Sequence, residues 1–389
     1  MAAVENKLII LGGNTEMKKA NKWRLGVVAL ASVMVLGACG GGGNSTDSSG
    51  GTDKGTDSSA AGGKKYSVAL VTDTGGVDDK SFNQSAWEGM QAWGNENGIK
   101  KGVGGYNYFQ SQNASDYANH INTAVNNGFQ TIFGIGYLLK PDIQKAATQF
   151  PDTTFGIIDE EIPDMDNVVS ATFADHEASY LAGIAAAYMT KTNTVGFIGG
   201  AEGPVIDRFE AGFNKGVNDT AEKLGKKVEV KNQYAGDFSA PDKGKSIAAS
   251  MYNGGADIIF HASGGTGVGV FAEAIAKNEQ KTEAELKDEQ VWVIGVDRDQ
   301  EADGAFTTKD GKEANCTLTS TLKGVGAAVQ DISNRAMNGE FPGGEHLTYA
   351  LKDGGVDLTA GVISEEAQKA VDEAKQGIID GDIEVPEKP

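Results

Sequence analysis

Carboxylates, an amide and aromatic rings follow the predicted strands of this chain, where an α/β protein binds its ligands. The loop after the first predicted strand carries Asp73, Phe82 and Asn83, and later strands lead into Asp159 and Asp297. Carboxylates accept hydrogen bonds from neighbouring hydroxyl groups, and aromatic rings stack on a flat base or a sugar face. These residue types favour a neutral, polyhydroxylated ligand with an aromatic or apolar face. The acidic loops argue against an anionic ligand, which would need converging cations.

Several of these residues also have ordinary structural interpretations. Phe82 and Phe209 each lie at a predicted helix start, so a place in the core is as consistent with the pattern as ligand contact. Asp78 and Asp79 fit either ligand contacts or caps of the first helix. The glycine-rich loop around Gly265 lacks the Lys-Ser/Thr ending of a phosphate-binding P-loop.

No pattern of catalytic or metal-binding residues is evident in the sequence. The four histidines are scattered without metal-ligand spacing, and neither a nucleophile elbow nor a Ser-His-Asp order occurs. Cys316 is expected to be a buried, unreactive thiol. The sequence therefore predicts neither a metal site nor a cofactor.

The elements that must position these residues alternate between short apolar strands and longer amphipathic helices. In the first half we predict strands at 68–71, 131–135, 154–158 and 168–173, with helices at 82–98, 116–126 and 176–189. The pattern restarts with strands at 194–198, 228–232, 257–260 and 291–294 and helices at 208–224, 243–253 and 268–277. This order predicts two α/β lobes with mainly parallel sheets and a ligand cleft between them.

Composition agrees with this fold class and narrows the partners. The chain has 389 residues, too many for one comfortable core, and combines 54 glycines with only 8 prolines. Its formal net charge is −20, which argues against nucleic acid or an anionic membrane surface as a partner.

The N-terminal region has the features of an export signal. A basic stretch at 18–24 precedes an apolar run at 25–36, which ends in Leu-Gly-Ala-Cys39. That ending resembles the lipobox of bacterial lipoproteins, which implies a signal at 1–38 and lipidation of Cys39. Met17 is the expected true start, and 40–65 reads as a flexible Gly/Ser tether. The alternative is an ordinary secretory signal with an incidental cysteine.

The body of the chain, from about Tyr66 to Pro386, resembles the basic membrane protein family, the nucleoside-binding lipoproteins of ABC importers. The resemblance rests on five motifs, at 73–83 with Trp87-Glu-Gly89, 207–213, 261–267, 293–300 and 319–323. It implies the type I periplasmic-binding fold and a binding protein rather than an enzyme. The implied lobes comprise 66–172 with 298–318, and 173–297 with the C-terminal segments.

The resemblance also implies roles for individual residues. Asp73 and Asn83 would bind a base on which Phe82 stacks, and either Phe209 or Phe238 would complete the stack from the second lobe. The ribose would be held by Asp159, the Gly265 loop, Asp297 and Lys323, with the charges of Asp297 and Lys323 paired. Tyr137 is where a difference in selectivity is expected.

The implied partners are a nucleoside, expected to be a purine nucleoside, and the permease and ATPase subunits of the importer. The protein would be a monomer held at the extracellular face of a bacterial, Gram-positive membrane by its lipid alone. Two alternatives stay open. One is a nucleoside hydrolase, because residues 72–79 are superficially similar to its Asp-rich Ca²⁺ loop, although the proline is absent and the spacing is one residue longer. The other is a sugar or small-signal receptor of the same fold.

Overall fold

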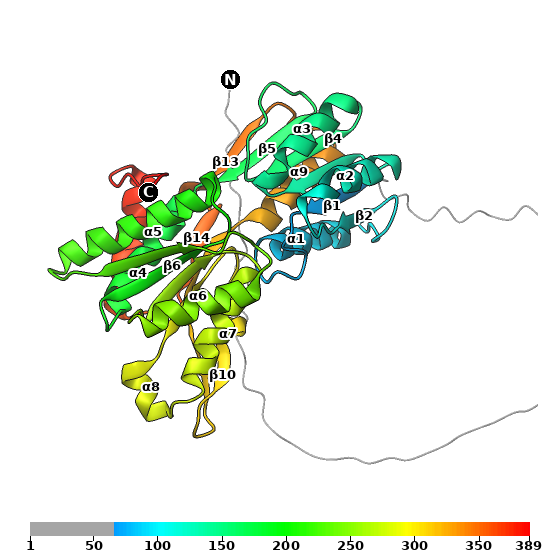
Figure 1. Ribbon diagram of the computed structural model, residues 1–389. Coiled ribbons are helices and arrows are strands. Elements are labelled where there is room, and N and C mark those ends of the chain that lie inside the picture. Colours follow the sequence, from blue (N-terminus) through cyan, green and yellow to red (C-terminus); the bar gives the residue numbers. More distant parts are fainter. Residues whose placement is uncertain (1–65) are drawn as a thin grey trace, which may run out of the picture. The chain divides into compact units, whose positions relative to one another are not determined.

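Two six-stranded sheets organise the protein, whose computed structural model describes residues 66–389. The predicted signal, Cys39 and the tether lie outside the described residues. The first sheet has the order β13-β5-β4-β3-β1-β2 and is parallel throughout (Figure 1). Its strands are β1 (Val68–Thr72), β2 (Tyr106–Phe109), β3 (Thr131–Ile135), β4 (Thr154–Ile158), β5 (Val168–Phe173) and β13 (His346–Tyr349).

The second sheet repeats this arrangement with one antiparallel edge. Its order is β14-β12-β9-β8-β6-β7, and only the β12–β14 pair is antiparallel. Its strands are β6 (Thr194–Gly199), β7 (Glu229–Tyr234), β8 (Ile258–Ala262), β9 (Trp292–Gly295), β12 (Thr317–Lys323) and β14 (Val356–Leu358). The predicted α/β fold with two parallel-sheet lobes is therefore confirmed.

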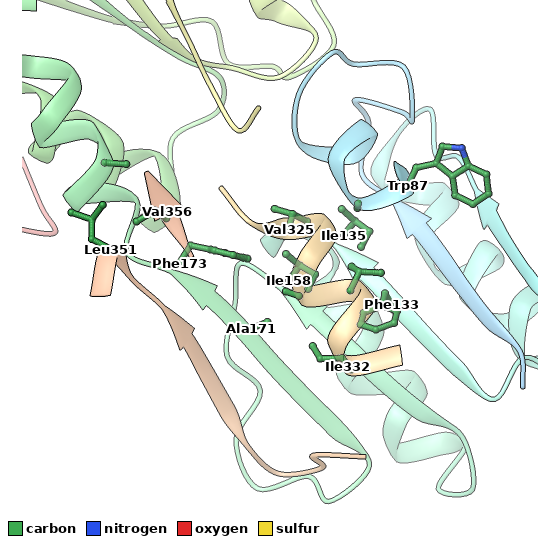
Figure 2. Packing of buried hydrophobic residues seen from close by; sticks show 14 of the residues in the cluster. Trp87, Phe133, Ile135, Ile158, Ala171, Phe173, Val325, Ile332, Leu351 and Val356 are labelled. Atoms are coloured by element: carbon green, nitrogen blue, oxygen red, sulfur yellow. The ribbon is translucent and has the colours of Figure 1, made fainter. Parts of the chain in front are cut away.

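Helices cover both faces of the first sheet because its strands are apolar on both sides. Val68 and Leu70 of β1 pack toward α1 (Phe82–Glu96) and α9 (Val325–Met337), whereas Ala69 and Val71 pack toward α2 (Tyr117–Asn126) and α3 (Lys140–Gln149). Figure 2 shows the first of these cores, where Val325 and Ile332 of α9 lie over Phe133 and Ile135.

The second sheet is covered in the same way. Helices α4 (Asp175–Met189) and α5 (Pro204–Lys223) pack on one face, and α6 (Pro241–Asn253) and α7 (Thr266–Asn278) pack on the other. Helix α10 (Glu365–Asp380) adds Ala370 and Val371 to the first core. The remaining elements are α8 (Glu283–Glu289), the hairpin of β10 (Ala305–Thr307) and β11 (Glu313–Asn315), and the 3₁₀ turns η1 (Ala114–Asp116), η2 (Tyr137–Leu139), η3 (Glu301–Gly304) and η4 (Leu351–Asp353).

The boundary between the lobes differs from the one expected. Residues 298–318 were assigned to the first lobe, but the chain passes through the β10–β11 hairpin and returns to the second sheet as β12, beside β9. The C-terminal segments also divide, because α9 and β13 belong to the first lobe. Strand β12 has the sequence Thr-Leu-Thr-Ser-Thr-Leu-Lys and is mostly buried. It was not predicted because the prediction of buried strands relied on runs of apolar residues. Among residues 66–389, no helix is long and apolar enough to span a bilayer.

Candidate functional site

A cavity lies where the loops after the strands of both sheets meet, as the parallel topology requires. Its wall combines residues from the first lobe, among them Asp73 and Tyr137, with residues from the second, among them Ser263. Of the predicted ligand residues, the structure brings Asp73, Phe82, Asn83, Asp159, Phe209, Phe238, Asp297 and Lys323 together in this wall. Gly265 is not part of the lining, but its neighbour Gly264 is.

At the first-lobe end, a carboxyl and an amide are joined directly. Asp73 begins the loop after β1, and its Oδ1 accepts hydrogen bonds from the Gly75 N–H at 2.9 Å and from Asn83 Nδ2 at 2.7 Å. Burial raises the pKa of Asp73 to about 7, because the charged form is removed from water and its protein partners are neutral. This carboxyl is therefore poised to gain or lose a proton near neutral pH.

For Asp79 the sequence allowed either a ligand contact or a helix cap. In the structure it caps a helix and also lines the cavity. Its carboxylate accepts from the backbone N–H groups of Ser81, Asn83 and Gln84 at 2.8, 2.9 and 3.1 Å, so it caps the start of α1. It also lines the cavity and accepts from Asn83 Nδ2 at 2.9 Å. Asp78 is exposed.

At the other end of the cavity, which we call the hinge end, a buried ion-pair cluster surrounds Lys323, the last residue of β12. Lys323 Nζ lies 2.6 Å from Asp159 Oδ2, which follows β4, and 3.0 Å from Asp175 Oδ1 at the start of α4. Arg208 of α5 pairs with the other oxygen of Asp175 at 3.2 Å. Burial alone lowers the pKa of Lys323, but Asp159, Asp175 and Asp297 raise it above its ordinary value, so the ammonium stays charged.

Asp297 connects the lobes, and its charge interacts with that of Lys323 without forming one of the close ion pairs of this ammonium. Its carboxylate accepts a hydrogen bond from Ser81 Oγ of the first lobe, whereas the ion pairs of Lys323 are with Asp159 and Asp175. Burial raises the pKa of Asp297 to about 7, although nearby Lys323 opposes the shift. Asp159 and Asp297 both adopt positive φ, at 70° and 67°, which turns the chain sharply after each strand.

Three phenylalanines line the cavity, and they differ in how deeply their side chains are buried. Phe82 is half-buried, with its ring centroid 5.2 Å from Lys323 Nζ. Phe238 is also half-buried and meets Tyr137 edge to face at 6.4 Å. Phe209 is only 3% exposed and packs on Phe260, so it is a core residue with one edge in the cavity wall. Phe209 therefore belongs to the core and also lines the cavity, and its contact with a ligand stays a prediction.

Some functional-site residues were not predicted from the sequence. Val205 and Ile206 line the cavity from the first turn of α5, which begins at Pro204, before the helix predicted from 208. Asp175 belongs to the Lys323 cluster and not to the cavity lining, and it was missed because it lies one residue before the predicted helix 176–189. Pro204 at the first helical position was the available signal for the earlier start of α5.

The geometry fits binding better than hydrolysis. A calcium loop needs carboxylate oxygens that converge, but the Asn83 amide nitrogen lies between Asp73 and Asp79 and donates to both. Within residues 66–389, no group of three or more His, Cys, Asp or Glu side chains is arranged to hold a metal ion. The cavity instead offers acceptors, half-buried rings and one buried cation.

Comparison with known proteins agrees with this arrangement. The family model for PnrA-like ABC transporter substrate-binding proteins (Bmp) matches residues 66–389. The chain is 50% identical to the CD4+ T-cell-stimulating antigen of Listeria innocua over 362 residues, covering 92% of this chain and 96% of that protein. It is also 50% identical to the ABC transporter nucleoside-binding protein BmpA of Lactococcus lactis over 364 residues, covering 93% and 97%.

A solved structure supports the same assignment. The solute-binding protein of an ABC transporter system from Aeropyrum pernix superimposes with a TM-score of 0.71 at 26% identity, covering 82% of this chain and 94% of that one. The Lactococcus and Aeropyrum proteins are both binding proteins of ABC transporters. The chain therefore belongs to the PnrA-like (Bmp) family of ABC transporter substrate-binding proteins.

Proposed function

We propose that this protein captures nucleosides, purine nucleosides above all, in the interlobe cavity and delivers them to the permease of an ABC importer. One observation carries the proposal: the half-buried ring of Phe82 shares the cavity wall with the Asp73–Asn83 pair and lies 5.2 Å from Lys323 Nζ. A base stacked on Phe82 would meet the amide and carboxyl at its edge, and its ribose hydroxyls would meet Asp159 and Asp297. The nucleoside-binding name of the Lactococcus relative is in keeping with this.

Binding would be coupled to closure of the lobes. Besides the Ser81–Asp297 bond, Gln300 Nε2 donates to the Lys80 carbonyl at 3.1 Å, and Arg298 pairs with Glu88 at 3.3 Å. Each joins the second lobe to the first, so a ligand that contacts both lobes favours this closed arrangement through its differential affinity. The closed form is the state that would dock on the permease and its ATPase subunits.

Calorimetric titration tests the proposal. The purified protein is partly unfolded and refolded to remove carried ligand, then titrated with adenosine, guanosine, inosine, uridine and cytidine, with adenine and ribose as controls. One-to-one binding of nucleosides, with both fragments far weaker, is the expected result. Preference for free ribose would instead support the sugar-receptor alternative, and calcium-dependent release of free base would support the hydrolase.

We also propose that Cys39 carries a lipid that holds the protein at the outer face of the membrane. The Leu-Gly-Ala-Cys39 pattern behind a basic and apolar segment supports this. Replacing Cys39 by Ala should move the protein from the membrane fraction to the medium. Cys316→Ala is the matched control, because that thiol is fully buried in the second lobe and its loss should leave the protein at the membrane.

A further inference from the structure

The Asn83 amide is held in a single orientation by two carboxylates. Its Nδ2 lies 2.7 Å from Asp73 Oδ1 and 2.9 Å from Asp79 Oδ2. Both oxygens already accept backbone N–H groups, Asp73 Oδ1 from Gly75 and Asp79 Oδ2 from Asn83 itself. Turning the amide over would place its oxygen against two acceptors, so the nitrogen must face them. The loop closes tightly here, since a Cβ on Gly75 would lie 2.9 Å from Asn83 Nδ2.

Two polar atoms are consequently left for a ligand at this end of the cavity. Asn83 Oδ1 is buried and has no hydrogen-bond partner among the described residues, in a side chain that is 2% exposed overall. The hydrogen bonds that Asp73 accepts from described residues both go to Oδ1. Its Oδ2 faces Gly136, where an added Cβ would lie 3.1 Å away. The amide oxygen accepts only, whereas Asp73 Oδ2 accepts when ionised and donates when protonated.

We propose that Asp79 fixes the Asn83 side chain as a hydrogen-bond acceptor and that the protonation of Asp73 selects the purine that binds. This inference rests on the proposed nucleoside function. Guanine presents N1–H and N2–H₂ donors side by side, which match Asn83 Oδ1 and an ionised Asp73. Adenine presents its N6–H₂ donor beside the N1 acceptor, which matches Asn83 Oδ1 and a protonated Asp73. Asp79 is a positioning residue in this scheme, and Asp73 is the discriminating one.

The groups around Asp73 determine which titration is observed. Asp79 and Asp159 face it and oppose its ionisation, whereas the Gly75 N–H and the Asn83 amide favour it. Burial raises the pKa of Asp79, and the four N–H hydrogen bonds that its carboxylate accepts oppose this shift and favour the ionised form. Tyr117 of α2 and Tyr137 of η2 also face Asp73, and the pKa of each is raised, so both stay neutral in this range. Asp297 titrates at the hinge end, where adenosine and guanosine are identical, so its effect cancels in their affinity ratio.

The sign follows from the proton count. Adenosine binding takes up a proton on Asp73, so its affinity should fall by up to about tenfold per pH unit as pH rises above the pKa of about 7. Guanosine needs the ionised carboxyl, so its affinity should fall by a similar factor per unit as pH drops below that pKa. The two affinities therefore move in opposite directions.

Calorimetric titration of the whole protein with adenosine and guanosine, from about pH 5.5 to about pH 8.5, is the test. Buffers of different ionisation enthalpy reveal proton uptake with adenosine and proton release with guanosine, without any variant. Asp73→Asn sharpens the result. Because Gly75 and Asn83 keep donating to Oδ1, the new Nδ2 faces the cavity as a permanent donor. This variant should lose about tenfold or more for guanosine relative to adenosine, and the ratio should no longer depend on pH.

Asp79→Asn should free the Asn83 amide to rotate and reduce discrimination between the purines. Asp78→Asn, the same change at the exposed neighbouring residue, should leave the ratio and its pH dependence unchanged. A wild-type ratio that does not change with pH, with no proton exchange, would overturn this inference while leaving nucleoside binding intact. Absence of nucleoside binding at every pH would instead reject the proposed function.

Discussion

The two ends of the cavity use the same residue type in opposite ways. Asp73 and Asp159 each follow a strand of the first sheet and are almost fully buried. The protein donors to Asp73 are a backbone N–H and an amide, both neutral. The protein partner of Asp159 is the Lys323 ammonium, which also contacts Asp175.

This difference separates discrimination from anchoring. A carboxyl held by neutral donors keeps a proton that exchanges near neutral pH, and so it can change between donor and acceptor. Burial also raises the pKa of Asp159, but the Lys323 ammonium opposes that shift and favours the charged form, which accepts hydrogen bonds from hydroxyl groups. The first-lobe end is thus suited to distinguishing ligands, and the hinge end to holding what they share.

The largest effect is expected from removing the Lys323 ammonium, which should lower the free energy of unfolding. Lys323→Met leaves Asp159 and Asp175 buried without their ammonium, and we expect a loss of about 3–5 kcal/mol in the free energy of unfolding in urea. Lys215→Met removes the half-exposed pair with Asp219 on α5 and should cost no more than about 0.5 kcal/mol. Equal stability of the two variants would show that the cluster does not depend on Lys323.

Asp297→Ala tests the hinge end without removing its cation. We expect nucleoside affinity, measured by calorimetry, to fall about 10- to 100-fold, because hydrogen bonds to a charged group and the bond from Ser81 are lost together. The circular dichroism spectrum should stay unchanged. Binding close to that of the wild type would remove Asp297 from the site.

Three alanine substitutions should separate stacking rings from core rings. Phe82→Ala and Phe238→Ala should each cost about 1–3 kcal/mol of nucleoside binding, as base stacking does elsewhere. Phe209→Ala should mainly reduce the free energy of unfolding, because that ring packs on Phe260 in the second core. If Phe238→Ala binds normally and Phe209→Ala folds normally but binds weakly, Phe209 is the second stacking ring.

The smallest effect is expected at Tyr137. Its hydroxyl lies 3.5 Å from the carbonyls of Ala201 and Glu202 in the second lobe, which is long for a hydrogen bond. Tyr137→Phe should therefore change nucleoside affinity by less than about threefold while keeping the ring against Phe238. A larger loss would show that this hydroxyl contacts the ligand and contributes to selectivity.

Much of the fold and site followed from local sequence, because carboxyl ends of parallel strands converge. That rule identified Asp73, Asp159 and Asp297 before any contact was known. The search for apolar strands failed where polar residues form a buried strand, as in β12, which is rich in threonine. Because β12 was not predicted, the lobe boundary was placed incorrectly.

The sequence also could not distinguish neighbouring acids. Asp79 is buried and Asp78 is exposed, since the loop turns through Lys80, which has a positive φ of 62°. Contacts between distant segments, such as Ser81 with Asp297, depend on how the two lobes meet, and no local pattern encodes that. The orientation of the Asn83 amide also depends on three-dimensional contacts, with Asp73 and Asp79, that no local pattern encodes.

The most direct test is a crystal structure of the protein with guanosine, grown above the pKa of Asp73. We expect the base to stack on Phe82 with its N1–H edge toward Asp73 and Asn83, and the ribose to lie toward Asp297. Guanosine bound in the reverse direction, with its ribose at Asp73, or bound outside this cavity, would contradict it.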